Sequence, residues 1–416
     1  MMRNITILLL FISLSSYGVT LEHLIQEALI HSPIIKEKKI KKEIYREKEK
    51  QIRSSIYGKF YLYGGYEHLS EKTNLGFLDP SKGIAGMTFA NNFYSLGIGY
   101  SVPIFTGFRI SSELKIAEKE LYSADTEERL TKNELIYKIK KIYLNILLLN
   151  KQEKSLKAYI DSLKKLKENI AVSVKAGKKA EVDILKVEYQ LQDAYTKFEK
   201  IKSDIDNLKY EIRYLIGRQD LELKNFEDIK NKTQIPEIKE IENLLYLKKV
   251  QIEKEKTKEF IKKQKSLFYP QLDLDLIYSK RYASGESFDY YRIGLNIKYT
   301  LFDFGKRASA VLEGKKNYRL LKEKEKSIVL NLKKEINKAL SDIKISEERI
   351  KSAEKQIKFS KEIERIEKIK YESGVSDIFD LLKAKADRIA AETKYYEAFY
   401  KREIAVAYLN FLISEE

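Results

Sequence analysis

The chain combines two hydrophobic periods, one of two residues and one typical of helices. Apolar side chains occupy every second position in 272–276 and again in 291–301, and polar residues separate them. The stretch 95–104 repeats this alternation in the first half of the chain. A period of two is typical of β-strands with one apolar and one polar face. We therefore predict four strands, at 57–67, 92–104, 268–279 and 290–301.

The longest segments of the chain have a helical period instead. Leu135, Ile139, Ile142 and Ile146 recur at spacings of four, three and four residues. Sustained spacing of this kind is typical of a coiled-coil seam. The predicted helices are 19–55, with a pause at Ser32-Pro33, and 107–174, 180–216, 236–266, 305–372 and 377–413. The two longest would each extend over about 100 Å at 1.5 Å per residue.

These elements occur twice in the same order. Phe105 has a counterpart at Phe302, and Gly177 has one at Gly374, both 197 residues later. A constant offset over this distance indicates a tandem duplication of one strand-to-helix-to-helix unit. Both glycines lie at the predicted tip turns of helical hairpins, where a residue tolerant of positive φ is needed. The predicted repeats are 19–217 and 236–416, with a linker at 218–235.

The apolar faces of the four strands lack a predicted partner layer, because the rest of the chain is nearly all helix. Strands of about ten residues with alternating faces match transmembrane β-strands, and we favour this interpretation over a half-buried sheet on a soluble core. A charge at the bilayer midplane costs about 2–4 kcal/mol, so the apolar face of each strand should contact lipid and the polar face should contact water. The residues predicted to face lipid are Leu272, Leu274, Leu276, Ile293, Leu295 and Ile297. The residues predicted to face a barrel lumen are Asp273, Asp275, Arg292 and Lys298.

The N-terminal residues 1–18 have the features of a secretory signal. Arg3 supplies a positive charge, an apolar stretch of about ten residues follows, and Gly18 closes a small-x-small cleavage motif. The apolar stretch is too short to span a bilayer as a helix, and no later stretch is long enough either. We therefore expect an exported protein without a transmembrane helix.

Composition adds two constraints. The net charge is +17, but the positive residues are interleaved with glutamates, as in Lys361-Glu362, and not gathered in one patch. This pattern favours solvated helix faces over a nucleic-acid surface. The chain has no cysteine, which excludes disulfides and thiolate metal sites.

No catalytic constellation is evident. The three histidines, His23, His31 and His68, have no metal-ligand spacing. The glycines lie in strands and helical turns and form no phosphate-binding loop. We therefore predict that the protein is not an enzyme and has no cofactor or metal site.

Several motifs together carry a family resemblance. They are Pro103-Ile104-Phe105-Thr106-Gly107 with its counterpart at 300–304, Gly177 followed by Asp183-Ile184-Leu185, Gly374 followed by Asp380-Leu381-Leu382, and Ala28 followed by Ser32-Pro33. With the signal segment and the duplication, the chain resembles the TolC-type outer-membrane efflux protein family over essentially its whole mature length. It departs from the family at Ser32, where an asparagine is usual.

The resemblance implies a mainly helical fold with a transmembrane β part. Three chains would each add four strands to one twelve-stranded β-barrel, which continues as an α-helical tunnel across the periplasm. Four strands alone cannot close, and open edges are not tolerated in lipid. The tunnel would dock to a periplasmic adaptor protein and an inner-membrane pump. It would serve as the passive exit duct of an efflux or type I secretion system, for small molecules or polypeptides.

Two other classes remain as alternatives. The heptads alone would suit a structural or adhesive coiled-coil protein of the envelope, but the alternating strands and the duplication count against it. A nucleic-acid-binding coiled coil is disfavoured by the signal segment, so we expect no nucleic-acid partner.

The resemblance also implies a periplasmic gate lined by aspartates of the second tip, a position that Asp380 matches. Three residues later stands Lys383, where a second aspartate is common. In the first half, Asp183 is the counterpart of Asp380, and Lys186 is the counterpart of Lys383. Asp377 either supplies the missing carboxylate or only caps its helix. Because like charges around one axis repel, we predict a mixed Asp/Lys ring that neutralises itself when the gate is closed.

Overall fold

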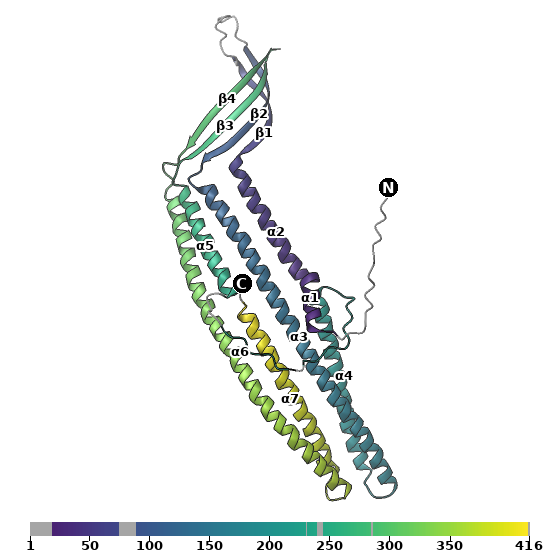
Figure 1. Ribbon diagram of the computed structural model, residues 1–416. Coiled ribbons are helices and arrows are strands. Elements are labelled where there is room, and N and C mark those ends of the chain that lie inside the picture. Colours follow the sequence, from purple (N-terminus) through teal and green to yellow (C-terminus); the bar gives the residue numbers. More distant parts are fainter. Residues whose placement is uncertain (1–18, 75–88, 230, 239–243, 284–285, 415–416) are drawn as a thin grey trace, which may run out of the picture. The chain divides into compact units, whose positions relative to one another are not determined.

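The computed structural model describes residues 19–74, 89–229, 231–238, 244–283 and 286–414 (Figure 1). The elements are α1 (Leu21–His31), α2 (Pro33–Ser54), η1 (Ser55–Tyr57), β1 (Lys59–Asn74), β2 (Phe89–Phe105), α3 (Arg109–Lys175), α4 (Val182–Ile216), α5 (Leu245–Ser266), β3 (Gln271–Ala283), β4 (Glu286–Lys298), α6 (Lys306–Glu372) and α7 (Ile378–Leu412). The predicted signal segment 1–18 lies outside the described residues. Within the described part of the chain, no helix has an apolar stretch long enough to cross a membrane.

The chain divides into two compact units, and each is built from segments far apart in the sequence. The sheet unit comprises Lys38–Glu128 and Tyr246–Ile328. The hairpin unit comprises Met1–Glu37, Arg129–Leu245 and Val329–Glu416. The helices α2, α3 and α6 each contribute residues to both units.

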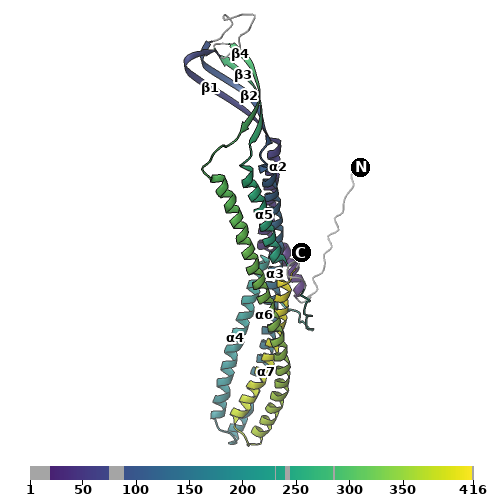
Figure 2. The same ribbon diagram turned by 90° about the vertical axis from the view of Figure 1, so that its left-hand side faces the viewer.

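The sheet unit holds one antiparallel sheet with the strand order β1-β2-β3-β4 (Figure 2). β1 and β2 extend to 16 and 17 residues, beyond the predicted 57–67 and 92–104. β3 begins at Gln271, after the predicted start at 268. β4 ends at Lys298, before the predicted end at 301, so that part of the strand prediction is wrong for the single chain.

The early end of β4 has a simple cause. Lys298 pairs with Gln271, the first residue of β3, so the residues after Lys298 have no neighbouring strand within the chain. The corresponding end of β2, from Val102 to Phe105, pairs with the start of β3. A strand persists only where its backbone groups find partners.

The long helices begin at equivalent caps. The Thr106 hydroxyl accepts a hydrogen bond from the Ile110 amide, 3.4 Å away, and the Asp303 carboxylate accepts one from the Arg307 amide, 3.0 Å away. These contacts satisfy amides that an α-helix leaves free in its first turn. The helices that follow, α3 and α6, have 67 residues each, and α4 and α7 have 35 each.

The structure sharpens one helix prediction, in which a pause at Ser32-Pro33 was expected, and corrects another. The predicted helix 19–55 is interrupted at Ser32, whose ψ of 124° is extended, because Pro33 disfavours a helical conformation in the residue before it. The predicted helix 236–266 begins at Leu245 and not at Pro236, since 236–238 are not helical.

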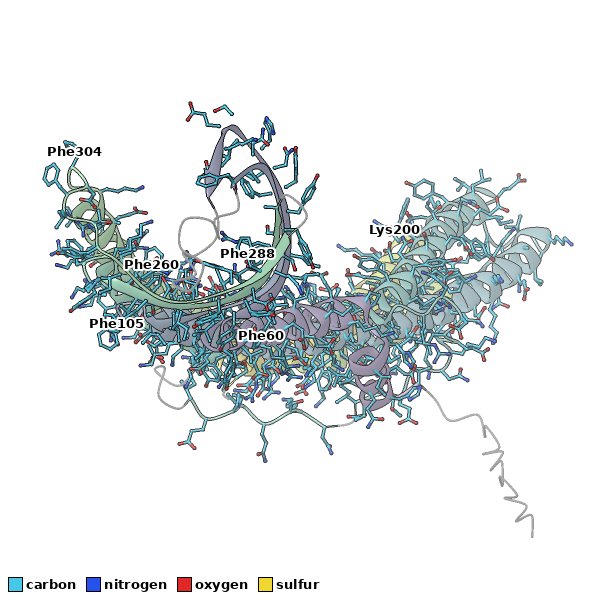
Figure 3. The ribbon with its side chains drawn as sticks, turned by 90° about the horizontal axis from the view of Figure 1, so that it is seen from above. Phe60, Phe105, Lys200, Phe260, Phe288 and Phe304 are labelled. Carbon is cyan, nitrogen blue, oxygen red and sulfur yellow. The ribbon has the colours of Figure 1, made fainter. Side chains whose placement is uncertain are left out.

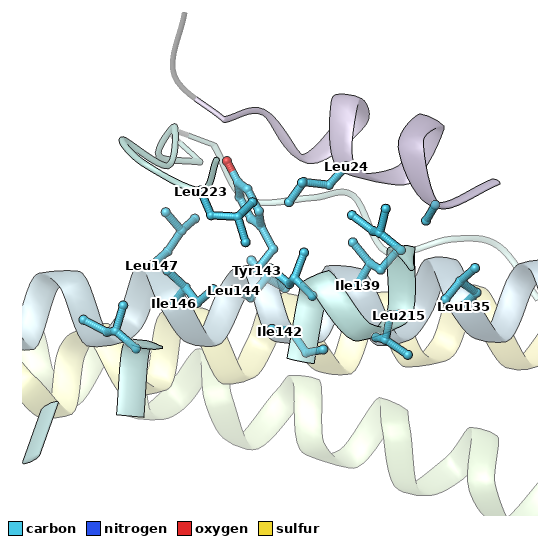
Figure 4. Packing of buried hydrophobic residues seen from close by; sticks show 14 of the residues in the cluster. Leu24, Leu135, Ile139, Ile142, Tyr143, Leu144, Ile146, Leu147, Leu215 and Leu223 are labelled. Carbon is cyan, nitrogen blue, oxygen red and sulfur yellow. The ribbon is translucent and has the colours of Figure 1, made fainter. Parts of the chain in front are cut away.

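The main core of the hairpin unit gathers around α3 (Figure 4). Leu24 from α1 and Leu215 from α4 are buried against the apolar stripe of α3 that includes Ile139 and Ile146. The Tyr143 hydroxyl lies 2.9 Å from the Val19 carbonyl and 2.7 Å from that of Glu227. The linker after α4 is therefore held against the helical core.

A second core lies near the tip turns of the same unit. Leu163 of α3, Val187 of α4, and Ile378 and Leu381 of α7 are almost completely buried in it. Buried apolar residues at helical spacing stabilise antiparallel hairpins by about 25 cal/mol per Å² of apolar surface removed from water.

Candidate functional site

One face of the sheet is apolar over most of its length. The strand register places residues of one face side by side: Leu62 pairs with Ile98, Ile98 with Tyr278, and Leu274 with Leu295. Exposed apolar residues on this face are Phe60, Leu62, Tyr66, Tyr94, Leu96, Ile98, Tyr278, Tyr291, Ile293, Leu295 and Ile297. Ile293 is 76% exposed and Ile297 70%. An exposed apolar surface that extends over four strands indicates contact with lipid or a partner.

The opposite face carries the four residues predicted for the lumen. Asp275 pairs with Gly294, Asp273 with Asn296, and Lys298 with Gln271. Arg292 pairs with Ile277 on the same face. The Asn296 amide also donates a hydrogen bond to the Asp275 carboxylate. The structure therefore brings both carboxylates and both cations to one side of β3 and β4.

The sheet is curved, and the polar face lies on the inside of the curve. Seen from above, Phe288, which pairs with Arg281 of the polar face, lies inside the curve and Phe60 of the apolar face outside it (Figure 3). Glycine at position 99 permits the tight inner face, because a Cβ there would lie 2.3 Å from the ring of Tyr61. The tyrosine ring thus covers the backbone of β2 on the inner face.

The two tip turns have the backbone that their glycines predict. Gly177 has φ of 67° and Gly374 has φ of 80°. The Gly177 amide donates to the Val174 carbonyl at 2.9 Å, and the Gly374 amide donates to the Tyr371 carbonyl at 3.1 Å. No atom lies within 4 Å of a Cβ placed at either glycine, so only the backbone conformation requires glycine there.

Lys186 connects the first tip to the second. Its ammonium lies 3.7 Å from the Asp377 carboxylate, 3.9 Å from that of Asp183 and 4.1 Å from the centre of the Phe379 ring. The Asp377 side chain also accepts a hydrogen bond from the Phe379 amide at 3.3 Å, so it caps α7 as well. The structure therefore shows the capping role considered for Asp377, together with a contact to Lys186.

Asp380 and Lys383 are both exposed. Neither forms an ion pair with another described residue. The Asp380 charge acts on Lys370, whose pKa is raised mainly by its hydrogen bond to Glu367 and to a smaller extent by Asp380.

Sequence analysis did not single out two further contacts near the tips. The Lys179 ammonium lies 3.8 Å from the centre of the Tyr371 ring, within cation–π distance, and 3.3 Å from the Tyr371 carbonyl. The Glu364 carboxylate accepts hydrogen bonds from Lys385, at 3.1 Å, and from Arg388. Only the fold brings these partners together, since Lys179 and Tyr371 are separated by most of one repeat.

The whole chain was compared with known protein families. The model of the outer membrane efflux protein family matches residues 24–218 and 239–415. The chain belongs to this family. Family membership confirms the function predicted from the sequence, an outer-membrane channel protein of efflux systems, and with it the outer-membrane location.

Solved structures of three outer-membrane proteins share the fold of this efflux protein. The outer membrane protein VceC of Vibrio cholerae matches with a TM-score of 0.80 and 15% identity, over 95% of this chain and 96% of that one. The CmeC channel of Campylobacter jejuni matches with a TM-score of 0.77 and 16% identity, over 94% of this chain and 85% of that one. The open MtrE channel of Neisseria gonorrhoeae matches with a TM-score of 0.75 and 17% identity, over 94% of this chain and 88% of that one.

These matches confirm the predicted fold class, long duplicated helical hairpins combined with barrel strands. No curated protein sequence matches the efflux protein significantly. The family is one of transport channels. Among the residues that the structure describes, no group of histidine, aspartate or glutamate side chains could hold a metal ion.

Proposed function

We propose that three copies of this chain form one twelve-stranded barrel in the outer membrane. The single observation that carries the proposal is the four-stranded sheet with one apolar face and two edge strands, β1 and β4. Such a sheet cannot remain open in lipid, because each unpaired backbone group there costs several kcal/mol. Twelve strands enclose a water-filled bore, whereas eight would fill it with side chains.

In this assembly the curved inner face of each sheet lines the bore. Asp273, Asp275, Arg292 and Lys298 would then face water, and the apolar outer face would contact lipid.

The duct would be passive. A periplasmic adaptor protein and an inner-membrane pump would supply the driving force, as the family implies, for efflux of small molecules or type I secretion of polypeptides. The hairpin unit supports this role with its extended helices and the two tip turns, where a narrow end can open and close.

We further propose that the tip residues form the periplasmic gate. Asp183, Lys186 and Asp377 form one charge cluster within a protomer, and Asp380 and Lys383 add exposed charges beside it. Opposite charges within 4 Å reduce repulsion around the axis, which favours a closed state that neutralises itself.

Light scattering and planar-bilayer recording on the mature protein in detergent test the proposal. We expect particles of three chains that conduct ions. A monomer or dimer that conducts would contradict the trimer. A stable trimer that never conducts would favour a structural coiled-coil protein of the envelope instead.

A further inference from the structure

A pocket lies at the end of the sheet nearest the long helices, between the start of α3 and the end of α5. Its volume is about 270 Å³, and its lining includes Phe108, Ser111 and Lys115 on one side and Glu259 and Lys265 on the other. All of its lining residues belong to the sheet unit. The volume is just below the range of about 300–1,000 Å³ typical of small-molecule sites, so the pocket suits a compact polar group.

The lining has an excess of positive charge. It contains Lys115, Lys262 and Lys265 but only one carboxylate, that of Glu259. The Lys262 ammonium lies 2.7 Å from this carboxylate. Lys115 and Lys265 are exposed and form no ion pair with another described residue. Two ammonium groups are therefore left for a compact anion, and phosphate is an anion that lysine binds well.

Glu259 adds an acceptor to the pocket. One of its oxygens accepts the hydrogen bond from Lys262, and the other is buried without a hydrogen-bond donor among the described residues. A buried acceptor that lacks a donor is costly, so a ligand that carries one is favoured here. The pocket thus suits a phosphate group with a hydroxyl or ammonium group attached to it.

The rim of the pocket continues into the apolar face of the sheet. Phe105, at the end of β2, pairs with Leu272 of that face and lies on the same outer side of the curve as Phe60 (Figure 3). The Phe108 ring is 5.7 Å from the Phe105 ring and 6.1 Å from the Tyr269 ring, measured between ring centres. Phe108 is 63% exposed. Basic and aromatic side chains at the end of an apolar strand face are typical of the level of lipid headgroups.

The internal repeat shows that this lining is not a general feature of the turn from strand to long helix. At the start of α6, 197 residues later, Gly305 replaces Phe108 and Leu312 replaces Lys115. The helix start is common to both halves, but only the first half has the exposed ring and the lysine. This difference favours a ligand that binds at α3 and not at α6.

We propose that the pocket binds the phosphodiester headgroup of one phospholipid from the leaflet that faces the periplasm. Lys115 and Lys265 bind the phosphate, and Glu259 accepts a hydrogen bond from the alcohol end of the headgroup. The acyl chains then lie against the apolar strands beyond Phe105. The proposal rests on the function proposed above, in which the apolar outer face contacts lipid.

The place of the pocket in the sheet keeps it accessible in the assembled channel. It lies beside the end of β2 and the start of β3, which are the two central strands of the sheet. Other copies of the chain would pair with the edge strands β1 and β4. A lipid at the pocket therefore does not compete with assembly.

Tryptophan fluorescence can test the proposal, because the natural chain has no tryptophan. Phe108→Trp places a single reporter at the rim of the pocket. The full-length mature protein is reconstituted in phosphatidylcholine vesicles that contain increasing fractions of phosphatidylglycerol with brominated acyl chains, since bromine quenches tryptophan on contact. We expect brominated phosphatidylglycerol to quench this reporter several-fold more strongly than brominated phosphatidylcholine at equal fractions.

A matched reporter separates the pocket from general contact with lipid. Phe60→Trp lies on the apolar face at the same end of the sheet, outside the pocket, where Phe60 is 83% exposed. We expect both brominated lipids to quench it equally. Lys115→Gln combined with Lys265→Gln should abolish the preference of the Phe108→Trp reporter and leave the Phe60→Trp reporter unchanged.

Equal quenching of Phe108→Trp by the two lipids would overturn the headgroup site while leaving the channel intact. Loss of the preference in inorganic phosphate, but not in sodium chloride of equal ionic strength, would overturn the lipid assignment and show a site for free phosphate. A preference that survives the double lysine substitution would overturn the roles of Lys115 and Lys265. If neither lipid quenches Phe60→Trp, the apolar face does not contact lipid and the proposed function itself fails.

Discussion

The two tip turns share a backbone but differ in the side chains that close them. At the second tip, Asp377 caps α7 through the Phe379 amide. The equivalent position at the first tip, 197 residues earlier, is Ala180, and α4 begins at Val182 without a side-chain cap. The duplicated turns have therefore kept the geometry that glycine provides while only one kept a carboxylate cap.

The equivalent lysines differ in a matching way. Lys186 at the first tip is 22% exposed in its side chain and lies near the Asp377 carboxylate of the second tip. Its counterpart Lys383 is exposed and forms no ion pair within the described residues. The comparison shows how a duplicated pair of hairpins becomes joined: one copy supplies the ammonium group and the other the carboxylate.

The largest effect is expected from charge reversal at Lys186. The Lys186→Glu substitution would place three carboxylates within a few ångströms, and their repulsion should separate the two tips. We expect a several-fold rise in closed-state conductance in planar bilayers. The matched Lys383→Glu variant should raise the closed-state conductance less, because Lys383 is exposed and forms no ion pair with a described carboxylate. Equal increases in both variants would contradict the asymmetry between the tips.

A second substitution at the exposed lysine should change ion block. Lys383→Asp adds a carboxylate one helical turn from Asp380 in each of three chains, and such clusters bind divalent or trivalent cations. We expect strong block of the bilayer current by these cations added on the periplasmic side. If the unmutated channel is blocked as tightly, Lys383 does not face the pore and the mixed-charge gate is wrong.

The two roles of Asp377 can be separated by size and charge. Asp377→Ala removes both the cap and the partner of Lys186, and loss of a cap costs about 1 kcal/mol. Asp377→Asn keeps a capping oxygen and removes only the charge. We expect the thermal unfolding midpoint to fall for alanine and to stay near the parental value for asparagine. Ala180→Asp at the other tip should raise the midpoint if a cap alone stabilises such a turn.

The smallest effect concerns alkaline pH at the second tip. Burial, with smaller contributions from Asp183 and Asp377, raises the pKa of Tyr371 to about 12. Folding thus favours the neutral phenol. This stabilisation is complete below the unfolded pKa of about 10 and is lost as the pH rises toward 12.

Thermal unfolding midpoints measured between pH 9 and pH 12 test this effect. The midpoint of the parental protein should fall more steeply than that of Tyr371→Phe. The first tip has Val174 at the equivalent position and contributes no such pH dependence. Parallel curves for the two proteins would show that ionisation of Tyr371 does not weaken the tip.

Sequence periodicity predicted the parts of the fold that depend on local pattern. The alternation in β3 and β4 placed Asp273 and Leu274 on opposite faces, and the constant offset located both tip glycines. It could not predict the contact between Lys186 and Asp377, which depends on how two hairpins pack. It also extended β4 to Leu301, since the pattern cannot show whether a neighbouring strand is present.

The helix boundaries show the same limit. Pro236 suits a helix start, yet α5 begins at Leu245, because a favourable first residue does not form a helix without packing. At Ser32 the following proline marked a pause in the sequence, and the structure shows that it separates two helices.

Thiol labelling of the channel in intact outer membranes tests the central claim most directly. In one variant Asp273 is replaced by cysteine, and in the matched control its neighbour Leu274 is. A small water-soluble thiol reagent should label Asp273→Cys, because that position faces the water-filled bore, and should not label Leu274→Cys, which faces lipid. Labelling of Leu274→Cys with protection of Asp273→Cys would contradict the assignment of the two faces and the channel built on it.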